Sequence, residues 1–274
     1  MKLIDFDGLF DEKLTEFMQT NKEKYTEKQW EDVIPKLYKK FGNTYVAKVK
    51  CTPKEYYAKM TDDELVECLK QHIKQEIPAP EFLCAEVESR SLDESLLPMI
   101  QSDNIEAVIY GVNLLGDNPV AFDSYFSILL DNRADEDVRS DIADILRLHA
   151  DEFKEKVLLA YEENKLGDVA LEILSRVKIR DERVYETLLT AFLSGENTPM
   201  RAGYLAAYGD ERALEHLLKR IEREDINFVE FQELKYAIEA LGGKYDTPRD
   251  FTNDKDYLAI EAASAKQTQE ENKS

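Results

Sequence analysis

Between about residues 93 and 243 the chain repeats an apolar pattern with a period near 32 residues. The anchors lie on every second expected helix, 33, 28, 32 and 33 residues apart, and are Val112, Ile145, Ile173, Leu205 and Ile238. Four residues after three of the anchors stand Gly116, Gly209 and Gly242, where glycine can end a helix in the left-handed conformation. Because a pair of helices of this length cannot bury its apolar face alone, the pattern predicts stacked helical pairs.

Apolar residues recur at spacings of three and four almost everywhere, which predicts helices and no hairpins. The first helices of the pairs are expected near 94–101, 122–131, 151–163, 182–193 and 211–224. Upstream, helices are expected near 11–21, 27–41, 53–60, 62–76 and 80–89. Three of the expected starts carry the capping-box pattern, which satisfies two backbone N–H groups reciprocally; these are Thr26 with Gln29, Thr52 with Glu55, and Thr61 with Glu64.

The pattern divides the chain into three parts. Residues 1–90 are expected to form an irregular helical region that is rich in large aromatic residues. Residues 91–262 are expected to form the repeats and a last capping helix over 250–262, and residues 263–274 a disordered polar tail. The fold class predicted is all-α, an α-α superhelix preceded by irregular helices.

Two stretches carry a family resemblance. Ala202–Glu215 reads as a small-residue helix, a Gly-Asp turn and an Ala-Leu helix start, and Asp135–Arg139 reads as an Asp-x-x-Val-Arg turn. These motifs resemble HEAT-type repeats over roughly 150 residues, and the resemblance implies a solenoid whose surface binds other chains. The 28-residue spacing and the polar Lys235 depart from the pattern and indicate one shortened and one weakened repeat.

The charge is strongly acidic and unevenly distributed. The chain holds 57 acids and 36 bases, a net charge of -21, and residues 91–200 alone hold 23 acids and 10 bases. Such acidic repeats are poorly suited to binding nucleic acid or an anionic membrane, because binding to either requires clustered Lys and Arg. Residues 33–54 are the exception, because they hold no acid and form a basic patch of Lys36, Lys39, Lys40, Lys48, Lys50 and Lys54. This patch is either plain solvated surface, a docking site for acidic repeats of this chain or another copy, or a weak nucleic-acid site.

Catalytic and metal-binding patterns are missing from the sequence. Cys51, Cys68 and Cys84 form no Cys-x-x-Cys pair, and the three histidines lie in no recognised ligand motif. We therefore expect no disulfide, no metal, no cofactor and no catalytic residue, and lean against an enzyme. An active site between the N-terminal helices and the repeats stays open as an alternative. The sequence also shows no apolar run of membrane-spanning length, and we expect a cytoplasmic protein.

The function that the sequence favours is a non-catalytic protein-interaction scaffold. The second helices of a solenoid line an extended surface that binds other chains. Tyrosines and acids on these helices would suit a basic protein or peptide. The expected partner-binding residues are Tyr110, Asp141, Asp144, Tyr204, Tyr208 and Glu239.

Overall fold

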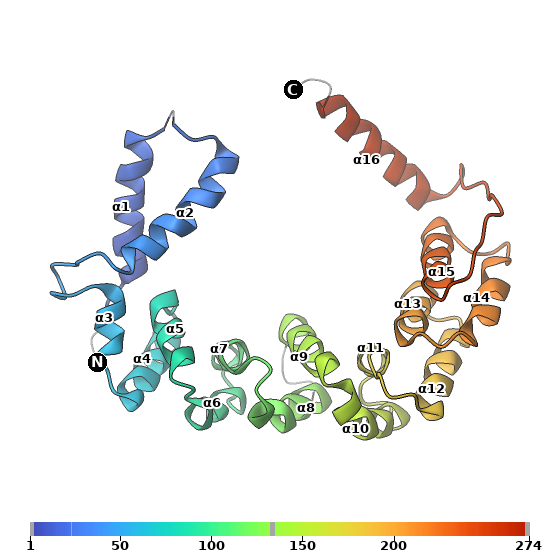
Figure 1. Ribbon diagram of the computed structural model, residues 1–274, viewed down its shortest axis with the longest axis horizontal. Coiled ribbons are helices and arrows are strands. Elements are labelled where there is room, and N and C mark those ends of the chain that lie inside the picture. Colours follow the sequence, from blue (N-terminus) through green and yellow to red (C-terminus); the bar gives the residue numbers. More distant parts are fainter. Residues whose placement is uncertain (1–2, 23, 132–134, 272–274) are drawn as a thin grey trace. The chain divides into compact units, whose positions relative to one another are not determined.

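The computed structural model describes residues 3–22, 24–131 and 135–271 (Figure 1). Throughout these ranges the regular elements are helices, sixteen of them α-helices, and no strand is present. A single isolated bridge joins Val46 to Cys51 in the loop after the second helix. The expected all-α class is confirmed.

The described helices fall into two compact units. Unit 1 comprises residues up to 128 together with 135–138, and unit 2 comprises 129–131 and the residues from 139 onward. This division lies inside the stretch that the sequence treats as one run of repeats. The predicted boundary between an irregular region and the repeats, near residue 90, stays a prediction. The predicted superhelical arrangement of the repeats also stays a prediction.

Unit 1 is built on an aromatic core where the first two helices meet the next three. Phe6 packs edge-to-face on Tyr57, and Tyr38 stacks on Phe82 with ring centroids 4.6 Å apart. The helices of this unit are α1 (Phe6–Thr20), α2 (Glu27–Phe41), α3 (Pro53–Ala58), α4 (Asp62–Lys74), α5 (Glu81–Ser89), α6 (Asp93–Ile100), α7 (Ile105–Leu115), the 3₁₀ turn η1 (Pro119–Ala121) and most of α8 (Phe122–Asp131).

The capping boxes place three of these helix starts as the sequence predicts. In α4, the Glu64 N–H donates to Thr61 Oγ1 at 3.3 Å, and the Thr61 N–H donates to Glu64 Oε2 at 2.8 Å. The same reciprocal pair begins α2 at Thr26 and α3 at Thr52. Each box satisfies donors that the first helical turn would otherwise leave without an acceptor.

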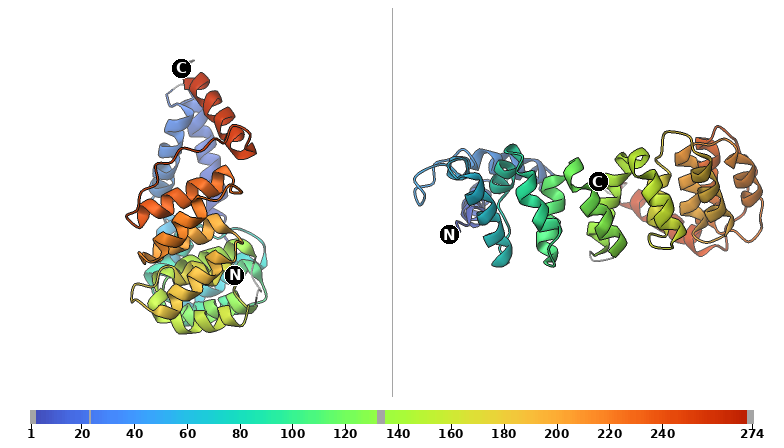
Figure 2. Two further views of the ribbon diagram at one scale, coloured as in Figure 1. Left: turned by 90° about the vertical axis from the view of Figure 1, so that its right-hand side faces the viewer. Right: turned by 90° about the horizontal axis from the view of Figure 1, so that it is seen from below.

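Unit 2 arranges its helices in two layers. The first helices α10 (Ala150–Glu162), α12 (Glu182–Leu193) and α14 (Ala213–Ile221) each pack on the second helix that follows. The second helices α11 (Asp168–Leu174), α13 (Thr198–Tyr208) and α15 (Phe228–Ala240) also pack on one another in series, as Figure 1 and the two views of Figure 2 show. This arrangement is compatible with a helical repeat.

The periodic anchors form much of the interior. Val112, Ile173, Leu205 and Ile238 are buried, whereas Ile145 of α9 (Glu136–Leu148) is half-buried because Ile142 and Leu146 take the interior positions of that helix. The three predicted glycine stops all have positive φ, at +48° for Gly116, +72° for Gly209 and +81° for Gly242. They end α7, α13 and α15 at the predicted places, Gly209 in the left-handed conformation and Gly116 with ψ at -129°.

The last helix, α16, runs over Lys255–Glu271 and therefore extends beyond residue 262, where the sequence ends it. It is joined to α15 through the aromatic residues Phe228 and Tyr257, whose ring centroids are 5.1 Å apart. Residues 272–274 of the expected polar tail lie outside the described residues.

Candidate protein-binding surface

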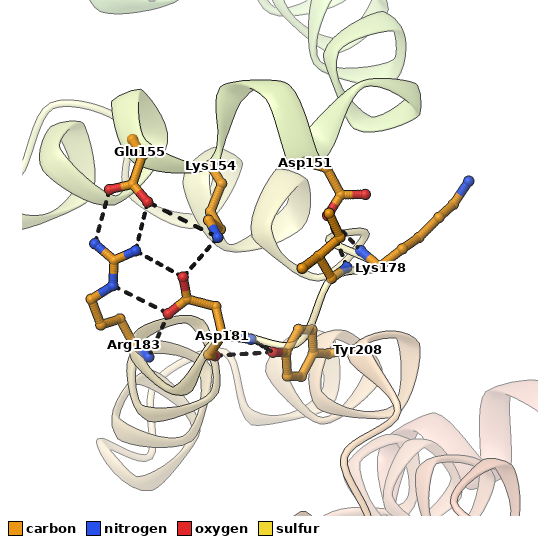
Figure 3. Close-up of polar contacts among 8 residues, drawn as sticks. Asp151, Lys154, Glu155, Lys178, Asp181, Arg183 and Tyr208 are labelled. Carbon is orange, nitrogen blue, oxygen red and sulfur yellow. Dashed lines mark hydrogen bonds and ion pairs between the residues drawn. The ribbon is translucent and has the colours of Figure 1, made fainter.

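The turns between the pairs of unit 2 carry an ion-pair ladder. Asp181 accepts from the backbone N–H of Arg183 and thereby caps α12. The Arg183 guanidinium binds Asp181 and also reaches Glu155 on α10, 28 residues earlier, with both carboxylate oxygens engaged (Figure 3). Lys154 approaches Asp181 to 2.7 Å from the same helix. The ladder therefore joins consecutive helical pairs.

The next turn repeats this geometry. Asp210 accepts from the Arg212 backbone N–H at 3.0 Å, and the Arg212 guanidinium binds Glu182 with two contacts of 2.9 Å. Arg212 also lies over the ring of Tyr185, 4.0 Å from its centroid. The tripeptide Asp-Glu-Arg occurs at 181–183 and again at 210–212, a 29-residue repeat that would have revealed this ladder from the sequence.

Tyr208 belongs to these turns and not to an open binding face. Its side chain is 4% exposed, and its hydroxyl lies 3.0 Å from both the backbone N and the backbone O of Asp181 (Figure 3). The Arg180 guanidinium covers its ring and donates to the backbone oxygens of Tyr208 and Gly209. Tyr208 therefore joins consecutive turns of unit 2 in this structure.

Two of the other expected residues meet on the second-helix layer. Asp144 of α9 pairs with Arg147, which also reaches Glu172 of α11. Tyr204 of α13 lies beside the same group, and desolvation, followed by the charges of Glu172 and Asp168, raises its pKa to about 12. Arg147 thus neutralises part of the acidic charge that the sequence assigned to this face.

The remaining expected residues lie apart. Asp141 is exposed one turn before Asp144, and Glu239 is exposed on α15. Tyr110 lies in unit 1 on α7, where its hydroxyl accepts from the Ala79 N–H at 2.8 Å. The structure therefore places Tyr110 in a half-buried structural contact and leaves Asp141 and Glu239 open to solvent.

The outward face of α13 and α15 carries large side chains that the sequence reasoning missed. Met200 is 52% exposed and Tyr236 is 61% exposed, with Val229 at 38%. The two helices bury the opposite side, α13 through Ala202 and Leu205 and α15 through Leu234 and Ile238. We call the surface formed by Met200, Gly203, Ala207, Val229, Tyr236 and Glu239 the α13–α15 face. The exposed positions are three, four or seven residues apart, as on one side of a helix, but periodicity alone does not tell an outward apolar stripe from an inward one.

All six lysines of the basic patch are exposed. They are spread over α2, the loop after it and the start of α3, and none of them takes part in an ion pair within the part of the chain that the structure describes. This arrangement leaves the lysine charges available to an anionic partner.

The chemistry-bearing groups of unit 1 are separate from these surfaces. A cleft of about 730 Å³ lies between the end of α4 and the turn joining α6 to α7, with Lys70, His72 and Glu106 among its lining residues. His72 is 1% exposed, and desolvation lowers its pKa. Among the described residues no group of three or more His, Cys, Asp and Glu side chains is placed to hold a metal ion.

Comparison with protein-family models, with characterised proteins and with solved structures gives no match for this chain. Within the described ranges, no helix combines the length and the apolar character needed to cross a membrane.

Proposed function

We propose that the protein is a non-catalytic interaction scaffold that binds a basic protein segment on the α13–α15 face. One observation carries the proposal: Met200, Val229 and Tyr236 are exposed on two helices that pack against each other. Aromatic and Met side chains are enriched in the cores of protein interfaces, and exposed apolar groups gathered on one surface favour association.

The shape of the face supports a peptide-like partner. Gly203 lies in the middle of α13 between Met200 and Ala207, and no atom lies within 4 Å of the position that a Cβ would take there. Gly203 and Ala207 lie four residues apart on the exposed side of α13 and form a low strip in which a helix or extended segment can approach the backbone. The exposed carboxylate of Glu239 on α15 favours basic residues in that segment.

The test is the binding of a fluorescently labelled basic amphipathic peptide of about four helical turns, followed by anisotropy with the full chain. Tyr236→Ala should weaken binding about tenfold, the loss expected for an aromatic anchor. Tyr45→Ala is a matched control, because Tyr45 in unit 1 is also 61% exposed. Equal affinity of both variants for the peptide would contradict the proposal.

A second variant tests the strip itself. Gly203→Arg places a long cation over the open strip and should abolish binding of the basic peptide, while far-UV circular dichroism stays that of the parent chain. Unchanged binding by this variant would show that the peptide contacts another surface.

A further inference from the structure

The hairpin of α1 and α2 is only partly buried within unit 1. At its base, Phe10 and Phe41 are buried, and Tyr38 stacks on Phe82. Away from the base, large apolar side chains of both helices are half-buried; these are Leu14, Phe17, Trp30, Val33, Ile34 and Leu37. These side chains bring half-buried apolar groups from two helices side by side on one surface of the hairpin.

A groove of about 150 Å³ opens between the two helices. Its floor is apolar, with Leu14 and Phe17 from α1 and Leu37 from α2 above the buried rings of Phe10 and Phe41. A cavity of this size accepts a benzene-sized group, so the groove can take one Leu or Phe side chain from a partner.

Lysines border this groove on both sides. Lys13 of α1 and Lys40 of α2 line it, and the Lys13 ammonium lies 5.1 Å from the centroid of the Phe41 ring. Lys36 lies one helical turn before Lys40 on the same side of α2. Within the described ranges none of the three forms an ion pair, so their charges are available to carboxylates of a partner.

We propose that this groove binds an acidic amphipathic helix of another protein. The helix would insert one Leu or Phe side chain between Leu14, Phe17 and Leu37 and place its carboxylates against Lys13, Lys36 and Lys40. Apolar anchoring combined with charge complementarity is how amphipathic helices bind grooves. This site is independent of the α13–α15 face and attracts the opposite charge.

The same observations favour a peptide over nucleic acid. A phosphate backbone needs a continuous basic track, and α1 interrupts the track with the exposed acids Asp11, Glu12 and Glu16 beside Lys13. A peptide helix can instead place single carboxylates opposite single lysines and uncharged side chains opposite these acids. The apolar floor contributes to binding only when the ligand carries a side chain that fills it.

The experiment titrates the full chain with a synthetic amphipathic helix that has Glu on its polar face and Leu and Phe on its apolar face. Trp30 is the sole tryptophan, and its ring lies 6.1 Å from Phe17 on the groove floor, so its fluorescence reports occupancy directly. Saturable binding that alters Trp30 emission and weakens with salt is expected. The charge-reversal variant Lys13→Glu/Lys36→Glu/Lys40→Glu should weaken it at least tenfold.

Two controls, together with a DNA duplex as a competing ligand, make the outcome decisive. The variant Lys48→Glu/Lys70→Glu/Lys74→Glu reverses three exposed lysines of the same unit outside the groove and should leave the affinity unchanged. A peptide with Ala in place of Leu and Phe should bind at least tenfold more weakly. Equal weakening by both triple variants, equal binding of the Ala peptide, or tighter binding of a DNA duplex at the same lysines would each overturn the proposal.

Discussion

Asp181 shows how a single side chain can serve two structural purposes. Its carboxylate caps α12 through the Arg183 N–H and is also the centre of the ion pairs with Arg183 and Lys154. These two cationic partners hold the pKa of Asp181 well below its ordinary value. The side chain is only 13% exposed, so screening by solvent weakens these interactions less than it would at the open surface.

Replacing Asp181 with Asn should keep the cap, since Asn is a good N-cap residue, and remove the charge. We expect the free energy of unfolding at neutral pH to fall by about 1–3 kcal/mol. Urea unfolding of Asp181→Asn and of the control Asp141→Asn, at an exposed position with no ion pair in the described chain, measures the difference.

The pH dependence follows from the direction of the shift. Because the folded-state pKa is lowered, the stabilisation by Asp181 is fully present above the unfolded pKa of about 3.9 and is lost as pH falls through the folded value. The gap between wild type and Asp181→Asn should thus stay constant from neutral pH to about 4 and close below it. A gap that persists in strong acid would show that the carboxylate charge is not the cause.

At the scale of the helix, two glycines in second helices have opposite surroundings. A Cβ at Gly203 of α13 would meet open space, whereas a Cβ at Gly111 of α7 would lie 2.5 Å from Ile100 Cγ2. The contact between α6 and α7 depends on the close approach at Gly111. Gly203, on the exposed side of α13, makes no such packing contact within the chain. A glycine there costs helix stability, which agrees with a role in admitting a partner.

Gly203→Ala should raise the free energy of unfolding by about 0.5–1 kcal/mol, because alanine restricts the unfolded chain and favours the helix. Gly111→Ala should lower it by about 1–3 kcal/mol through overpacking against Ile100. Thermal unfolding followed by circular dichroism checks both. The packing interpretation requires opposite signs, so destabilisation by both substitutions would contradict it.

Element starts and stops were largely predictable from sequence. The capping boxes of α2, α3 and α4 and the glycine stops after α7, α13 and α15 lie where the local pattern puts them, because their chemistry is confined to a few adjacent residues. Thr198 is an exception. A threonine directly before Pro199 is the pattern of a cap followed by a first-turn proline. Asn197 takes the cap position instead, and the buried Thr198 hydroxyl donates to the Gly195 carbonyl.

The candidate surfaces were harder to predict, because they depend on which side of a helix faces a neighbour. Tyr204 and Tyr208 lie four residues apart on α13. Tyr204 lies near the charges of Glu172 and Arg147, whereas Tyr208 is enclosed by the turn at Asp181. On α15, Tyr236 is exposed, whereas its neighbours Lys235 and Ala237 are half-buried and buried. Sequence spacing locates such residues on a helix but does not identify the neighbours that cover them.

For the whole molecule, the net charge of -21 is the sum over surfaces that differ in the sign of their charge. Unit 1 carries the exposed lysines of the basic patch and a lysine-bordered apolar groove. Unit 2 pairs Glu155, Asp181, Glu182 and Asp210 within the ion-pair ladder and leaves other acids exposed. A chain with these two surfaces can select partners of opposite charge, which is how a scaffold would hold two different proteins.

Site-specific photo-crosslinking tests the scaffold function most directly. A photoreactive phenylalanine derivative replaces Tyr236 in the full chain, and a second preparation carries it at the equally exposed Tyr45. Our account predicts that position 236 forms an adduct with a distinct protein in cell extract. The basic amphipathic peptide should compete with this adduct and with no adduct that forms at position 45. Identical adducts at both positions, or none at position 236, would contradict the assignment of the α13–α15 face as the binding surface.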